Sequence, residues 1–88
     1  MSNHERLARL GRLTELRERF RSVEHRAEGV LESIRLATYV DPVAGALDLD
    51  ADKIADLAGA YRELHAQGVT LRAAITQLEE ELGLRPGQ

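Results

Sequence analysis

Three aspartates at alternate positions, Asp48, Asp50 and Asp52, come closest in this sequence to a metal-binding motif. A calcium loop of the EF-hand type requires a glycine at position 6 and a bidentate glutamate at position 12. If Asp48 is position 1, these positions hold Lys53 and Gly59, so a cation replaces the glycine and the last ligand is missing. We therefore predict that Asp48 or Asp50 caps a helix, with Asp52 in an early turn, where the helix dipole favours negative charge.

A second group of candidate ligands surrounds His25, which Glu28 and Glu32 follow at helical spacing. The other histidines, His4 and His65, are distant in sequence, and no HExxH motif or cysteine is present to complete a zinc site. Phosphate-binding and nucleophile motifs of the GxxxxGK, GxGxxG and GxSxG types are also missing. We interpret the His25 group as surface charges and predict a protein without catalytic residues, metal ions or cofactors.

The composition indicates a single small helical domain over residues 1–88. Leu, Ala, Glu and Arg dominate, aromatic residues make up only 3%, and the two prolines leave two long stretches uninterrupted. The N-terminal segment is charged every few residues, and no stretch reaches the ~20 apolar residues that a membrane-spanning helix needs. We therefore expect a cytoplasmic protein that does not bind membranes.

Apolar residues in the first half recur at alternating intervals of three and four, which is the a/d pattern of a coiled coil. They are Leu13, Leu16, Phe20, Val23, Ala27, Val30, Ile34 and Ala37. Leu31 lies beside this seam and widens it. The pattern predicts a helix from about residue 4 to about residue 40, capped by Ser2 or Asn3 and ended by Pro42.

The second half repeats the pattern and predicts a helix over about residues 51–83, followed by a tail at 84–88. Its seam residues are Ile54, Leu57, Tyr61, Leu64, Gly68, Leu71, Ile75, Leu78 and Leu82. Gly68 and Thr70 also resemble a helix end followed by a new N-cap. The heptad continues across Gly68 without losing a residue, however, which favours one continuous helix over a break or kink.

The two predicted helices, about 55 and 50 Å long, match in length and should form an antiparallel hairpin through the connector 41–50. Two helices cannot surround a stripe this wide, so we predict that the seam residues and Leu31 also mediate association, with a homodimeric four-helix bundle as the simplest product. The alternative is a monomeric three-helix bundle with a break at Gly68.

The connector is unusually apolar for a segment between helices. Tyr39, Val40, Val43 and Leu47 are expected to fold over the end of the bundle as a plug, and Gly45 to allow the bend. The other interpretation of the same residues is a tip that binds a partner.

Two elements are candidates for nucleic-acid binding. The first element is the set of arginines on the first predicted helix: Arg6, Arg9, Arg12, Arg17, Arg19, Arg21 and Arg26. The other is the segment Gly68–Leu78 with Arg72, which resembles the turn and recognition helix of a helix-turn-helix, although Glu79, Glu80 and Glu81 would then repel phosphate.

The net charge is +2 over residues 1–40 and −5 over residues 41–88, which suits two helices packed side by side. We predict a non-catalytic interaction and oligomerisation module, whose partners are a second copy of itself and another protein. A nucleic-acid-binding regulator is the alternative.

Overall fold

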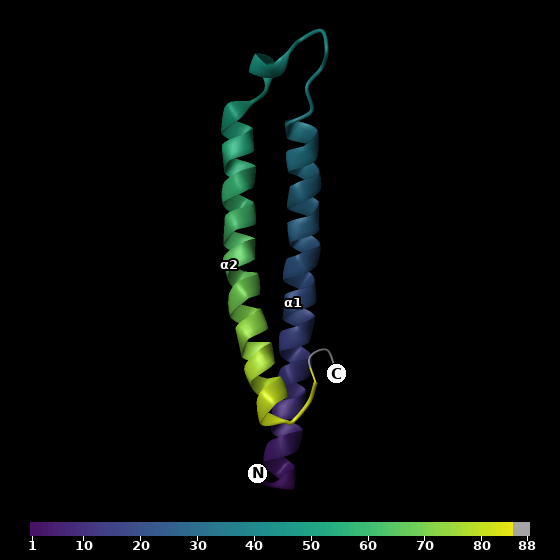
Figure 1. The fold of residues 1–88 in the computed structure, drawn as a ribbon, viewed down its shortest axis with the longest axis vertical. Coiled ribbons are helices and arrows are strands. Elements are labelled where there is room, and N and C mark those ends of the chain that lie inside the picture. Colours follow the sequence, from purple (N-terminus) through teal and green to yellow (C-terminus); the bar gives the residue numbers. More distant parts are fainter. Residues whose placement is uncertain (86–88) are drawn as a thin grey trace.

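Two long helices lie side by side and run in opposite directions (Figure 1). In this computed structural model, which describes residues 1–85, helix α1 spans Asn3–Ala37 and helix α2 spans Ala51–Glu81. A short 3₁₀ helix, η1 (Ala46–Asp48), lies in the connector between them. The molecule measures 66 × 19 × 15 Å. The predicted all-α, antiparallel helical hairpin is therefore confirmed.

Both helices begin at side-chain caps. The Ser2 hydroxyl accepts a hydrogen bond from the backbone N–H of Glu5 at 3.1 Å, and the Asp50 carboxylate accepts one from the backbone N–H of Lys53 at 3.0 Å. These bonds satisfy N–H groups that have no partner within a helix. Asp52 lies in the first turn of α2. The alternate aspartates thus mark a helix start, as predicted.

Helix α1 ends at Ala37, about three residues earlier than predicted. Thr38 is the C-cap, and its hydroxyl (2.7 Å) and backbone N–H (2.9 Å) both donate to the carbonyl oxygen of Ile34. Thr38 and Val40 are both β-branched, and β-branched residues favour a helix less than unbranched ones do. Pro42 also disfavours continuation, because in a longer helix its ring would clash with the carbonyl group of Thr38, the C-cap residue.

Helix α2 ends at Glu81 in a Schellman motif, about two residues before the predicted boundary. Gly83 adopts φ +70°, its N–H donates to the Glu80 carbonyl, and the Leu84 N–H donates to the Glu79 carbonyl at 2.8 Å. Glycine occupies this left-handed position without the strain that a side chain causes. The motif turns residues 84 and 85 back toward α1.

Gly68 lies within α2, which continues through it without interruption. A Cβ atom placed on Gly68 would lie 3.9 Å from Phe20 Cε2 and 3.9 Å from Val23 Cγ1, so the glycine faces α1 across the seam. The three-helix alternative is therefore wrong. The turn required by the helix-turn-helix interpretation is also missing, since Gly68–Leu78 is continuous helix. Packing along the seam outweighs the ~1 kcal/mol helix penalty of glycine.

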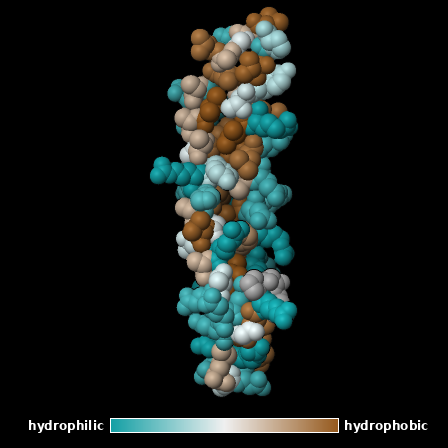
Figure 2. Space-filling model, viewed as in Figure 1, coloured by the Kyte–Doolittle hydropathy of each residue, from teal (hydrophilic) through white to brown (hydrophobic). Residues whose placement is uncertain are grey.

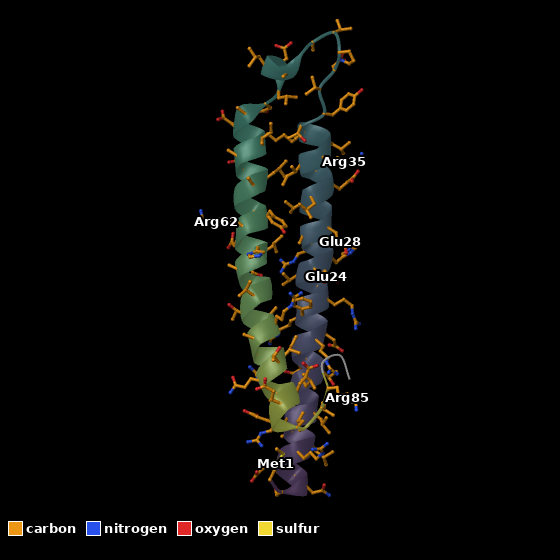
Figure 3. The ribbon with its side chains drawn as sticks, in the orientation of Figure 1. Met1, Glu24, Glu28, Arg35, Arg62 and Arg85 are labelled. Carbon is orange, nitrogen blue, oxygen red and sulfur yellow. The ribbon has the colours of Figure 1, made fainter. Side chains whose placement is uncertain are left out.

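The buried hydrophobic residues concentrate near the end of the hairpin that carries the chain termini. They are Leu13, Leu16, Val23, Leu64 and Leu82. From residue 24 to residue 63 no side chain is buried. Side chains of both helices still meet along the whole seam, while Arg35 and Arg62 project outward from opposite sides of the hairpin (Figure 3). The core is therefore closed at one end and open at the other.

The connector does not form the predicted plug. Val43 and Leu47 are 96% and 100% exposed, and Tyr39 and Val40 are exposed as well. The chain arches away from the helix ends (Figure 1). Within this arch, the Asp41 carboxylate accepts a hydrogen bond from the backbone N–H of Val43. Gly45, at φ +90°, provides the expected bend. The end of a two-helix hairpin is too narrow to offer these side chains a surface to cover.

Candidate interaction surface

Most of the predicted seam is only half-buried. Leu13, Leu16, Val23, Leu64 and Leu82 are buried, whereas the other twelve seam residues retain partial solvent exposure. These twelve are Phe20, Ala27, Val30, Ile34, Ala37, Ile54, Leu57, Tyr61, Gly68, Leu71, Ile75 and Leu78. Leu31 is 47% exposed. The hairpin thus brings the predicted seam residues together along one line but leaves that line open to solvent on both sides.

A groove runs along one side of the seam near mid-length. It consists of two adjoining hollows of about 490 and 600 Å³, which share Phe20, Glu24, Arg72 and Thr76. We call them together the central groove. The larger hollow has an apolar floor, to which Val23, Ala27, Tyr61, Leu64, Gly68 and Val69 contribute. The small residues at this level leave room for a side chain from outside the hairpin.

Polar groups at the edge of the central groove are held in place by aromatic rings. The Arg72 guanidinium lies over the Phe20 ring, 5.0 Å from the ring centroid. Such a cation–π contact contributes about 0.5–1 kcal/mol at an exposed site. Tyr61 and His65, one turn apart on α2, have ring centroids 6.2 Å apart. The groove therefore combines an apolar floor with an edge of aromatic and charged residues, among them Arg72 and Glu24.

Large exposed hydrophobic side chains gather at the connector end. Leu36 and Tyr39 are 64% and 69% exposed, and Val43 and Leu47 are more exposed still. We define the apolar end as Leu31, Leu36, Tyr39, Val40, Val43 and Leu47. Figure 2 shows hydrophobic residues over this end and hydrophilic residues over much of the opposite end. Contiguous exposed apolar surface is typical of interaction sites.

Three of the arginines proposed as nucleic-acid contacts instead contact the C-terminal part of the hairpin. Arg17 Nη2 lies 2.9 Å from Glu79 Oε2, and Arg9 Nε lies 3.6 Å from Glu81 Oε2. Arg6 Nη1 donates to the carbonyl oxygen of Leu82 at 3.2 Å. These side chains tie α1 to the end of α2.

The remaining candidate arginines divide between surface and groove. Arg12, Arg19 and Arg26 are exposed on α1, and Arg21 is exposed at the edge of the central groove. Arg72 stacks on Phe20, as described above. The arginines of α1 therefore do not form one continuous basic face, because Arg9 and Arg17 are paired with carboxylates.

His25 contacts only one of its two neighbouring carboxylates. His25 Nδ1 lies 3.9 Å from Glu28 Oε2, and both side chains are largely exposed. Across residues 1–85, no three His, Asp or Glu side chains converge in a geometry that could hold a metal ion. Within the same residues, neither helix has the length and apolar character of a membrane span.

One ion pair on the surface of α1 shifts a pKa. Arg35 donates two hydrogen bonds to the carboxylate of Glu32, and these bonds lower the pKa of Glu32 below its ordinary value. The same contact raises the pKa of Arg35. Both groups are exposed, so the pair fixes local side-chain geometry rather than stabilising the fold.

Sequence reasoning missed the burial of Glu79. Its side chain is 6% exposed and pairs with Arg17, yet Glu79 was read only as part of an acidic surface run. Both residues occupy an e position of their heptads, and e positions of antiparallel helices face each other across the seam. Aligning the two heptads in antiparallel register would therefore have identified this pair.

The fold and surface define an elongated two-helix hairpin with an open apolar seam. Comparisons of the chain with family models, with curated proteins and with solved structures found no match.

Proposed function

We propose that the protein is a non-catalytic interaction and oligomerisation module that buries its open seam against a second copy of itself. The half-buried seam between α1 and α2 is the observation that supports this proposal. Each apolar side chain that leaves water on association contributes about 25 cal/mol per Å² of area buried. A homodimer would bury the same surface on both copies and produce a four-helix bundle.

The apolar end supports a second contact in the same proposal. Val43 and Leu47 form no part of the core of the hairpin, so their exposure contributes nothing to its own stability. An adaptor of this kind would hold its partner protein through the connector and its copy through the seam. The nucleic-acid alternative has less support, because Arg6, Arg9 and Arg17 already contact the C-terminal part of the chain.

Sedimentation equilibrium of the wild-type chain and of Leu31→Glu tests the proposal. Leu31 is half-exposed beside the seam, so a glutamate there should disturb association while leaving the hairpin folded. We expect a wild-type dimer, a weaker variant dimer and equal helix content by circular dichroism. Leu47→Glu is the matched control, since Leu47 is fully exposed in the connector and lies outside the seam. A wild-type chain that stays monomeric at high micromolar concentration would contradict the proposal.

A further inference from the structure

Charge is distributed unevenly along the length of the hairpin. Val23 and Gly68 face each other near mid-length, and they divide the chain into a connector half (residues 24–63) and a terminal half (residues 1–23 and 64–85). The connector half holds nine acidic and four basic residues, a net charge of −5. The terminal half holds six acidic and eight basic residues, a net charge of +2. The long axis therefore carries an electric dipole.

The same reversal of charge occurs beside the central groove. On the terminal side of Val23 the groove is lined by Arg21, Arg72 and the Arg17–Glu79 ion pair, and on the connector side it is lined by Glu24. Glu28 follows Arg21 by seven residues and so shares its face of α1. Close to mid-length on this face, Arg21 therefore lies on the terminal side and Glu24 and Glu28 lie on the connector side.

The central groove lies at the level where a two-fold axis would cross the hairpin. Val23 and Gly68 both line it, and the small residues Gly68, Ala27 and Ala73 leave space above its floor. Val69, 56% exposed, is an apolar side chain on its edge. In a symmetric dimer, the surface that lies on the two-fold axis packs against the same surface of the second copy. The central groove, with the apolar Val69 side chain beside it, is complementary to itself in this way.

We propose that the occupant of the central groove is a second copy of the chain in the reversed orientation, with its connector half against the terminal half of the first. This inference rests on the proposed self-association and adds the face and the direction of packing. The two-fold axis crosses α1 near Val23, so α1 of one copy lies antiparallel across α1 of the other. Arg21 of each copy then approaches Glu24 and Glu28 of the other.

Electrostatics favours the reversed dimer over a parallel dimer. A parallel dimer places two connector halves of charge −5 together, and like charges at close range are unfavourable. The reversed dimer instead places the connector half of each copy, with charge −5, against the terminal half of the other copy, with charge +2. It also brings the exposed Leu7 to the level of the exposed Tyr39 of the second copy, since the two residues are equally distant in sequence from Val23.

Distances between labels on single cysteines test the orientation, and the cysteine-free chain allows each label to be placed alone. His4→Cys marks the terminal end and Ala44→Cys marks the connector, and both positions are exposed. We expect two Ala44 labels in one dimer to be separated by nearly the full 66 Å length of the molecule. A dimer that combines the His4 and Ala44 variants should give a distance well below half of that length.

A charge exchange on the groove face provides a second test. Arg21→Glu and Glu28→Arg should each weaken the dimer about two- to tenfold, because each creates two like-charged contacts across the two-fold axis. The double variant Arg21→Glu/Glu28→Arg should return to within about twofold of the wild-type dissociation constant. Helix content by circular dichroism should be the same in all four proteins, since both side chains are exposed.

Each remaining outcome overturns a different part of the inference. A short distance between two Ala44 labels, or a double variant that is weaker than both single variants, would contradict the reversed packing but leave self-association in place. A monomeric mass together with no intermolecular distance for either label would contradict self-association itself and the reversed dimer with it.

Discussion

The half-buried Arg17 guanidinium and the buried Glu79 carboxylate form an ion pair, with Nη2 and Oε2 2.9 Å apart. They are 62 residues apart in sequence, so the pair forms only when the hairpin closes in its observed register. Sliding α2 by one heptad would separate Arg17 from Glu79 and break this contact. The pair thereby helps to select one alignment of the two helices.

Removing one partner of this pair should cost more than removing both. Arg17→Met should lower the free energy of unfolding by about 1–3 kcal/mol, because it removes the 2.9 Å contact between the Arg17 guanidinium and the buried Glu79 carboxylate. Arg17→Met/Glu79→Leu should recover most of that loss, since apolar side chains suit the site. Urea unfolding of the two single variants and the double variant measures the coupling. Additive effects would show that the pair does not select the register.

Gly68→Ala should raise the free energy of unfolding by up to about 1 kcal/mol. The new methyl group meets Phe20 and Val23 at 3.9 Å, an ordinary contact distance, and alanine favours helix over glycine. Thermal unfolding at fixed protein concentration is the measurement. Gly59→Ala is the matched control within α2, because its methyl group meets nothing within 4 Å and reports helix propensity alone. A loss of stability at Gly68 only would mean that the seam cannot accept the methyl group.

Leu16→Glu and Leu64→Glu should unfold the hairpin. Both side chains lie in the small buried core, at 4% and 9% exposure, and a charge there has no partner. The expected cost of several kcal/mol exceeds what a hairpin of this size can lose. Circular dichroism should report the loss of helix. Leu36→Glu is the control, since its site is 64% exposed, and it should remain helical.

Polar substitutions in the connector should leave the stability of the hairpin unchanged. Val43→Ser and Leu47→Ser replace side chains that are already almost fully exposed, so each should change the free energy of unfolding by less than about 0.5 kcal/mol. A plug over the core would instead lose about 1.5–3 kcal/mol per side chain. Chemical denaturation of each variant separates the two cases.

The pKa of Glu32 should rise when Arg35 is removed. In the folded protein the hydrogen bonds from Arg35 lower that pKa, so their contribution is present above the ordinary pKa of a glutamate and is lost as pH falls through the folded value. NMR titration of the Glu32 carboxylate in wild type and in Arg35→Met measures the shift. Arg26→Met is the control and should leave the Glu32 pKa unaltered.

The hairpin itself could be predicted from the sequence because the two heptads are long and unbroken. Periodicity reports which face of a helix is apolar, and the continuity of phase across Gly68 correctly outweighed the local resemblance to a helix end. Helix starts were also predictable, since Asp50 caps α2 through its own side chain.

The features that sequence reasoning missed depend on the space around each residue. The apolar composition of 39–47 suggested a plug, but whether such a segment finds a surface to cover depends on the width of the hairpin end. The burial of Glu79 depends on the antiparallel register of the two helices. Periodicity along one helix contains none of this information.

The mass of the protein in solution, measured by light scattering over a range of concentrations, tests the central claim most directly. The open seam predicts a mass of twice the 9.8 kDa chain at high micromolar concentration, falling toward the chain mass on dilution. A constant mass of 9.8 kDa over the whole range, with full helix content, would show that the hairpin is stable with its seam exposed and would contradict the account.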